Sequence, residues 1–426
     1  MMRRILAATT VLCLSAGCLS AGLAWAADLP VAKPADVGMG RLDRLDAFFK
    51  GETAAKRLPG AVVIIARDGK VVYHQAFGMR DPATASPMQK DSIFRIYSMT
   101  KPITAVAVLM LMEEGKLRLG DPVSRFLPAF KGPKVLTETI DAQGQHRTTT
   151  VPAEREITIQ DLLRHTSGIT YGVFGNSAPD QMMKDAGLHL AEKRNSLTDR
   201  EVADEIAKIP LLFQPGTQWQ YSRATDVLLA VVEVASGQRG DAFMAERIFK
   251  PLGMVDTSFN VAPDKLDRVA QTGPDPDTGT TVSLTDVRQT RTFLGGGEGL
   301  LSTASDYLRF GVMLANGGVL DGARLLSRKS VELMAADHLP PGVGSGPNYF
   351  PGPGYGFGLT VAVRREAGQS NVPGSVGEYN WGGYAGTKFW VDPKERLVPV
   401  MMIQAPLQSR NAGNAFRGLV YQAILD

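Results

Sequence analysis

Runs of β-branched and apolar residues near both ends of the 426-residue chain limit its fold more than any other feature. Residues 61–66 and 71–77 are two such runs separated by Asp68-Gly69, a combination typical of a β-hairpin. Near the C-terminus, residues 392–395 have the composition of a turn between two further runs. The strands expected late in the chain are residues 356–363, 384–391 and 397–404. We therefore expect one sheet built from both ends of the chain.

Helical patterns fill the region between these strands. Residues 98–114 are apolar on most faces and stop at Gly115, which predicts a buried helix. Other helices are expected at residues 40–50, 159–163, 199–207, 225–234, 241–248 and 415–425. Residues 132–156 and 339–356 show neither pattern, and long loops of this kind often border a binding site. The chain thus predicts a sheet with a helical insert at roughly 160–290.

The first 26 residues have the pattern of a secretory signal peptide. Arg3 and Arg4 precede an apolar stretch, and Ala-Trp-Ala at 24–26 predicts cleavage before Ala27. The mature domain is then residues 27–426, located in a bacterial periplasm or in the medium. An uncleaved membrane anchor is disfavoured because glycine, alanine and serine are frequent in this stretch. Lipidation at Cys18 is also disfavoured, and without it we expect no stable membrane association.

Composition excludes several classes of partner and cofactor. Both cysteines, Cys13 and Cys18, lie in the leader, so the mature chain is expected to contain no disulfide and no thiolate metal site. The five histidines lack ligand spacing, so we predict no metal and no cofactor. The net charge of +3, part of it in the leader, gives no basic surface for nucleic acid. The oligomeric state is left open.

Ser98-Met99-Thr100-Lys101 is the one Ser-x-x-Lys tetrad in the sequence. At this spacing on a helix the hydroxyl and the amine share a face and can form a hydrogen bond. A serine needs a nearby base to become a nucleophile, and a lysine in an apolar setting can be that base. The alternative is a serine at a helix start followed by a surface lysine. The apolar helix that follows favours the catalytic interpretation, although the tetrad alone does not settle it.

With this tetrad, the sequence resembles the serine β-lactamase and penicillin-binding-protein superfamily, in the class C-like branch that includes the family VIII carboxylesterases. The resemblance extends over nearly the whole mature chain. It rests on blocks at residues 94–102, 162–168, 215–222, 251–259, 295–310 and 381–386. It implies a β-lactamase/transpeptidase-like fold of the α/β (α+β) class, with a central antiparallel sheet flanked by helices.

The resemblance also assigns roles to residues outside the tetrad. Tyr221, in Tyr221-Ser222-Arg223, takes the place of the tyrosine that shuttles a proton to the leaving group. Trp381-Gly382-Gly383 takes the place of the strand along which substrate lies, so these three residues are expected to bind substrate. The backbone N–H groups of Tyr384 and Ser98 are expected to form the oxyanion hole.

Two departures from the family pattern bear on the substrate. Arg223 stands where an asparagine contacts the amide side chain of a β-lactam, and it is expected to contact substrate. Trp381 stands where a lysine or histidine helps to bind the β-lactam carboxylate, and an indole cannot pair with a carboxylate. Both changes favour neutral, hydrophobic esters.

We therefore expect a carboxylesterase that works through an acyl-enzyme on a small-molecule ester. A β-lactamase or D-Ala-D-Ala carboxypeptidase on the same fold is the second hypothesis. A non-catalytic binder of peptidoglycan or acyl ligands is the third. His165 and the glycines at 295–297 are interpreted as structural, with the glycines forming a tight bend below the site.

Overall fold

The computed structural model describes residues 28–140, 146–344 and 349–426. The expected signal peptide and Cys18 lie outside the described residues. Within the described part, no helix is long and apolar enough to cross a membrane.

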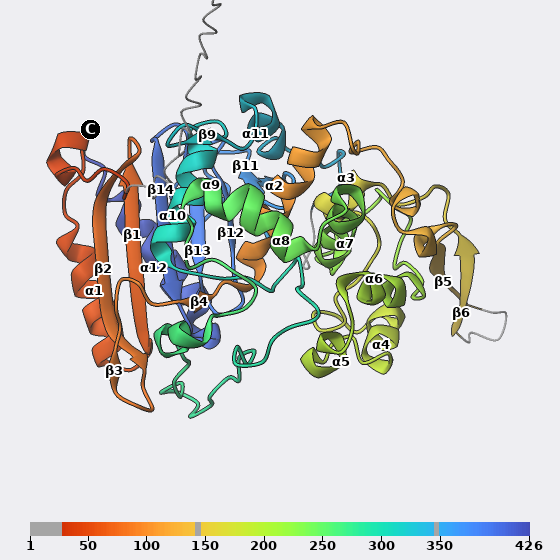
Figure 1. Cartoon of the computed structure of the whole chain (residues 1–426), viewed down its shortest axis with the longest axis horizontal. Coiled ribbons are helices and arrows are strands. Elements are labelled where there is room, and N and C mark those ends of the chain that lie inside the picture. The colour runs from red at the N-terminus through yellow and green to blue at the C-terminus, as the bar shows by residue number, and fades with distance from the viewer. Residues whose placement is uncertain (1–27, 141–145, 345–348) are drawn as a thin grey trace, which may run out of the picture.

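An eight-stranded antiparallel sheet forms the centre of the fold, in the order β10-β11-β12-β13-β14-β1-β2-β3. Figure 1 shows strands from the two ends of the chain meeting in the middle of this sheet. The α/β (α+β) class and the sheet built from both ends are therefore confirmed. Its strands are β1 (Gly60–Arg67), β2 (Lys70–Asp81), β3 (Ser86–Pro87), β10 (Tyr355–Phe357), β11 (Ala362–Arg364), β12 (Tyr379–Gly382), β13 (Lys388–Val391) and β14 (Leu397–Ile403).

The β1–β2 hairpin forms where the sequence predicts it. Asp68 and Gly69 both have positive φ, +55° and +70°, as a tight two-residue hairpin turn requires. Every residue of β1 is buried, because both faces of the sheet are covered. Alternate β1 residues accordingly belong to two different apolar clusters, one on each face.

Helices cover the two faces of the sheet. On one face α1 and α12 pack together, and on the other α10 lies across β1, β13 and β14 (Figure 1). The other helices lie around α2 and in the region between the strands contributed by the two ends. The helices are α1 (Asp43–Ala54), α2 (Thr100–Glu113), α3 (Ile159–Leu163), α4 (Ala178–Asp185), α5 (Ala191–Asn195), α6 (Asp199–Ala207), α7 (Ala224–Ser236), α8 (Gly240–Met244), α9 (Lys250–Leu252), α10 (Ala304–Ala315), α11 (Arg328–Met334) and α12 (Ser409–Tyr421).

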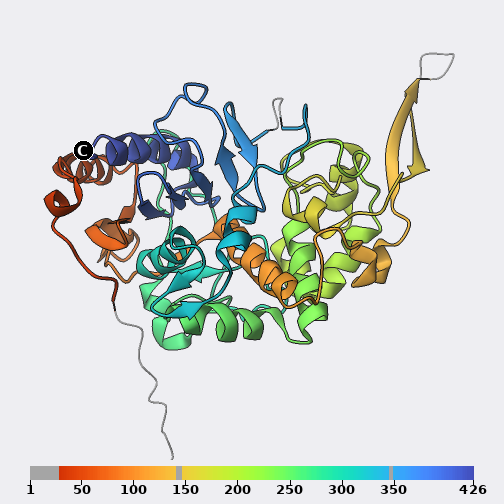
Figure 2. The same ribbon diagram turned by 90° about the horizontal axis from the view of Figure 1, so that it is seen from above.

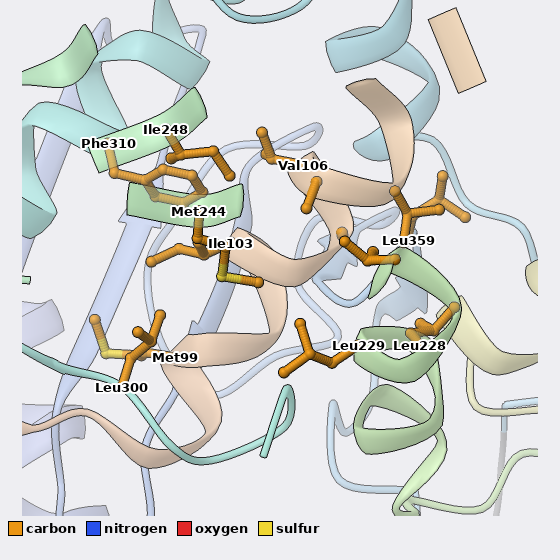
Figure 3. Packing of buried hydrophobic residues seen from close by; sticks show 14 of the residues in the cluster. Met99, Ile103, Val106, Leu228, Leu229, Met244, Ile248, Leu300, Phe310 and Leu359 are labelled. Atoms are coloured by element: carbon orange, nitrogen blue, oxygen red, sulfur yellow. The ribbon is translucent and has the colours of Figure 1, made fainter. Parts of the chain in front are cut away.

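Helix α2 joins the sheet to this helical region. It is buried from Thr100 to Leu111, and Figure 3 shows Ile103 and Val106 among side chains of α7, α8 and α10. Burying one such side chain contributes about 1.5–3 kcal/mol relative to leaving it exposed. The start of α2, which directly follows Ser98 and carries Lys101, is therefore anchored in the buried core.

Three segments differ from the sequence-based expectations. Residues 132–156 contain a hairpin of β5 (Lys134–Ile140) and β6 (His146–Pro152), which extends away from the body of the molecule (Figure 2). The strand expected at 384–391 begins only at Lys388, because 383–387 form a turn that returns the chain from β12. The strand expected at 356–363 is instead the hairpin of β10 and β11, with Thr360 at positive φ in its turn.

Four short strands complete the fold. They pair as β4 (Phe94–Arg95) with β7 (Leu301–Ser302), and β8 (Val319–Leu320) with β9 (Ala323–Arg324). The β4–β7 pair fixes the chain directly before the tetrad.

Candidate active site

Ser98 lies in a single 3-10 turn, Tyr97–Met99, between β4 and the start of α2. The preceding residue, Tyr97, has a φ of +43°, which is strained for a residue with a side chain. The Tyr97 hydroxyl accepts a hydrogen bond from the backbone N–H of Thr285 at 3.2 Å, and this contact helps to hold the turn. The sequence had predicted that Ser98 opens the helix, whereas α2 itself starts two residues later.

Lys101 lies in the first turn of α2, and its side chain points to the serine. Its Nζ donates to Ser98 Oγ at 3.2 Å and to the carbonyl oxygen of Gly297 at 2.8 Å. The side chain is only 1% exposed. A buried amine with one hydrogen bond to the backbone and one to a hydroxyl is fixed in the position that proton transfer from that hydroxyl requires.

Tyr221 approaches Ser98 from the loop that precedes α7. Its hydroxyl donates to Ser98 Oγ at 2.7 Å, and Lys101 Nζ lies 4.7 Å from the centre of its ring. The indole Nε1 of Trp381 donates to the Tyr221 hydroxyl at 3.4 Å. The structure thus brings the three predicted catalytic side chains together around one oxygen atom.

An aromatic cluster fixes the orientation of Tyr221. Aromatic rings surround it with centroid separations from 4.8 to 6.1 Å: His165, Tyr171, Phe174, Trp219, Phe350 and Trp381. A ring packed in this way loses little further entropy when it acts on a substrate.

The glycine loop at 295–297 contacts the catalytic lysine, a role that the sequence did not reveal. The expected bend is present, with Gly295 at a φ of +75°. The Gly297 carbonyl accepts from Lys101, while its N–H donates to Asp226 Oδ1 on α7 at 2.8 Å. The Asp199 carboxylate accepts the N–H groups of Leu294 and Gly295, each at 2.9 Å. Two buried aspartates therefore position the carbonyl that holds Lys101.

Arg223 does not lie where the sequence predicted it, and its assignment to substrate binding is corrected. It is 2% exposed, it pairs with Asp226 at 3.1 Å, and its guanidinium lies 4.6 Å from the ring centre of Tyr171. Buried charges are paired in this way because an unpaired one is costly. Arg223 therefore supports the loop behind Lys101 and does not line the cleft.

Glu298 is the second acidic partner in this buried network. Burial alone would raise the pKa of its carboxyl, but the surrounding cations, Arg194 first among them, hold that pKa well below its usual range. Glu298 accepts from Arg194 at 2.7 Å and from the Tyr171 hydroxyl at 3.2 Å. The network is charged and fixed beneath the site.

His165 is structural, as the sequence suggested. Burial, together with the nearby Lys101, lowers the pKa of His165 well below its usual range, so the imidazole is neutral. Its Nδ1 lies 3.1 Å from Ser222 Oγ, and its ring packs against Tyr221 at 4.8 Å. It positions the tyrosine and does not reach Ser98.

The segment from Trp381 to Tyr384 passes directly beside the nucleophile. A side chain at Gly383 would collide with the carbonyl oxygen of Ile96, so glycine is required for this approach. Tyr384 follows, and no acceptor for its backbone N–H occurs in the part of the chain that the structure describes. A free N–H at the mouth of the site has the chemistry needed to stabilise an oxyanion.

The nucleophile opens into a cleft of about 560 Å³. Ser98, Tyr221 and the segment 381–384 form one part of its lining. Exposed aromatic and apolar side chains lie around it, and they are Phe174, Phe350, Tyr384 and Leu407. The volume is that of a site for a small molecule.

Comparison with known proteins places this site in a family. Residues 45–422 match the family model described as Beta-lactamase. The chain is 35% identical over 369 residues to Esterase EstB from Burkholderia gladioli, and the matched region covers 82% of this chain and 86% of EstB. It is 30% identical over 394 residues to Lovastatin esterase from Penicillium rubens, which covers 85% of this chain and 93% of that enzyme. The solved structure of EstCE1, described as a hydrolase with promiscuous acyltransferase activity, covers 89% of this chain and 98% of EstCE1, with a TM-score of 0.74 at 27% identity.

Proposed function

Because the chain belongs to the beta-lactamase family and has esterases among its relatives, we propose that it is an exported carboxylesterase that works through an acyl-enzyme on Ser98. The observation that carries this proposal is the placement of two proton-transferring groups on one serine. Tyr221 lies 2.7 Å and Lys101 lies 3.2 Å from Ser98 Oγ, at the wall of a cleft of small-molecule size.

Acylation begins when Ser98 Oγ attacks the ester carbonyl carbon and its proton passes to the Tyr221–Lys101 pair. The carbonyl oxygen becomes an oxyanion that accepts hydrogen bonds from the backbone N–H groups of Ser98 and Tyr384. The tetrahedral intermediate then collapses. The bond to the alcohol oxygen breaks, and Tyr221 returns the proton to that oxygen.

Deacylation repeats these steps with water as the nucleophile. The Tyr221–Lys101 pair takes a proton from water, the hydroxide attacks the acyl carbon, and Ser98 leaves with the returned proton. The carboxylic acid is released and Ser98 is regenerated. The hydrogen bond from Lys101 to the Gly297 carbonyl, at 2.8 Å, orients the amine for these proton transfers.

The residue at the position of the strand cation departs from the family pattern for β-lactam binding, and this departure is compatible with an ester substrate. Trp381 provides an indole that donates to Tyr221, and it leaves no positive charge at that point of the strand. The names of the relatives EstB and Lovastatin esterase support the same substrate class.

The test compares hydrolysis of short p-nitrophenyl esters with hydrolysis of the β-lactam nitrocefin. Ser98→Ala is expected to abolish ester turnover, while Ser196→Ala, an exposed serine outside the cleft, should leave it unchanged. Full ester turnover by Ser98→Ala would overturn the mechanism, and faster turnover of nitrocefin than of esters would overturn the substrate class. Export is tested separately, because a mature N-terminus at Ala27 is expected in the periplasm or medium.

A further inference from the structure

The cleft is positively charged on one part of its lining. Lys388, Arg410 and Arg417 line it, and none of the described lining residues is an aspartate or a glutamate. Arg417 is paired with the buried Glu378, whose oxygens lie 2.5 and 2.7 Å from its Nη1 and which also accepts from Arg364 at 3.0 Å. Lys388 and Arg410 have no acidic partner among the described residues, so they are the lining cations most available to a ligand.

Lys388 occupies a space formed by two glycines. It lies on β13 opposite Gly382 of β12, the residue after Trp381. A methyl group placed on Gly382 would lie 3.3 Å from Lys388 Nζ. Any side chain at Gly413 of α12 would collide with the stem of Lys388. The ammonium group of Lys388 is therefore held between β12, the strand that carries Trp381 and Gly382, and helix α12.

The ammonium group of Lys388 has no hydrogen-bond or ion-pair partner among the described residues. Burial, with a contribution from Arg417 and Arg410, lowers the pKa of Lys388 to about 8. The side chain is thus still a cation at neutral pH, although its site is partly desolvated. A charge in such a site is stabilised strongly by a ligand of opposite charge.

Arg410 adds a second positive charge at the edge of the same region. It lies in the first turn of α12, is exposed, and also lines the cleft. Planar guanidinium groups pair well with carboxylates, in two parallel hydrogen bonds. Another part of the lining is aromatic, with Phe174, Phe350 and Trp381 all in contact with the ring of Tyr221. The cleft therefore combines an apolar wall with a cationic one.

We propose that the preferred substrates are esters that carry a carboxylate, and that Lys388 and Arg410 bind this carboxylate. The proposal rests on the proposed ester hydrolysis. This inference revises the expectation of an uncharged ester, which rested on the absence of a cation at Trp381. The positive charge is present instead on the neighbouring strand β13.

The test uses pairs of esters that differ in charge. On the acyl side, the p-nitrophenyl monoester of glutaric acid is compared with p-nitrophenyl valerate, which has a methyl group in place of the carboxylate. On the alcohol side, 4-acetoxybenzoate is compared with 4-methylphenyl acetate. The readout is the ratio of kcat/KM for the charged ester to that for its neutral partner.

Lys388→Met is expected to lower this ratio about tenfold or more in at least one pair, because a charge-assisted contact is lost. Arg410→Met, at an exposed position where folding is not at risk, should lower it less. Lys394→Met removes an exposed lysine outside the cleft and should leave the ratio unchanged. Equal ratios in wild type, Lys388→Met and Arg410→Met would overturn the proposal.

A binding measurement separates this site from the proposed reaction. Calorimetry with Ser98→Ala protein measures binding of the glutarate monoester without turnover, and adding Lys388→Met should weaken that binding about tenfold. If wild type hydrolyses no ester, the proposed function fails, yet this measurement still decides on the carboxylate site. Equal affinity with and without Lys388 would refute the site alone.

Discussion

Replacing Tyr221 by phenylalanine removes one oxygen atom from the site and leaves the packed ring in place. The lost hydroxyl lies 2.7 Å from Ser98 Oγ and accepts from Trp381 Nε1 at 3.4 Å. The aromatic contacts around the ring, at 4.8 to 6.1 Å, do not involve the hydroxyl and are retained. Each of these two hydrogen bonds contributes about 0.5–1.5 kcal/mol net, so the free energy of unfolding should fall by no more than about 3 kcal/mol.

The effect on catalysis should be much larger than the effect on stability. Loss of a positioned proton-transfer group costs about 100- to 10,000-fold in rate, which corresponds to roughly 3–5 kcal/mol of barrier. Steady-state kcat/KM for p-nitrophenyl valerate measures this loss, and urea unfolding measures the stability.

Tyr171→Phe is the matched control for this variant. Tyr171 stacks on Tyr221 with centroids 5.6 Å apart, but its hydroxyl donates to Glu298 and not to Ser98. Its loss, of one hydrogen bond to a charged group, should lower stability by an amount comparable to that of Tyr221→Phe and should lower kcat/KM much less. If Tyr221→Phe keeps more than about a tenth of the wild-type kcat/KM, the role of Tyr221 as proton shuttle is refuted.

Two further predictions concern the loop that holds Lys101. Gly297→Ala places a methyl group 2.9 Å from Asp226 Oδ1 and 3.3 Å from Lys101 Nζ. Because the methyl group displaces the lysine, kcat should fall by up to about 100-fold. A folded variant with the kcat of wild type would contradict this prediction. Burial raises the pKa of Asp199 to about 7, above its value of about 3.9 in the unfolded chain. The folded state therefore binds this proton more tightly than the unfolded state, which stabilises the fold at low pH. This contribution to the free energy of unfolding is lost as pH rises from about 4 to 7. Urea unfolding of wild type and Asp199→Asn at pH 4.5 and 7.5 measures this effect. Relative to wild type, the variant should have a higher free energy of unfolding at pH 7.5 than at pH 4.5. A difference that does not change with pH would rule out Asp199 as the titrating group.

Local chemistry made much of the fold predictable. The β1–β2 hairpin forms at Asp68-Gly69, and α3 and α6 begin after Thr158 and Thr198, each of which forms a capping box with the acidic residue three positions later. The β5–β6 hairpin was missed because its strands are polar and rich in threonine, so they lack the alternation of a half-buried strand.

The candidate site was predictable in its chemistry but not in its supports. Ser98 and Lys101 are neighbours on one turn, so their spacing alone indicates their contact. The hydrogen bond from Lys101 to Gly297 joins residues 196 positions apart, and no local pattern marks it. The burial of Arg223 was missed for a related reason, since it depends on Glu298 and Tyr171, which only the folded chain brings around it, as well as on the neighbouring Asp226.

Covalent labelling of Ser98 tests the central claim most directly. A fluorophosphonate is attacked by an activated serine and remains bound, so one probe per protein should be found by mass spectrometry on the peptide that contains Ser98. Esterase activity should fall in proportion to labelling, and Ser98→Ala protein should take up no probe. Labelling at another residue, or complete labelling of Ser98 with activity retained, would contradict the assignment of Ser98 as the nucleophile.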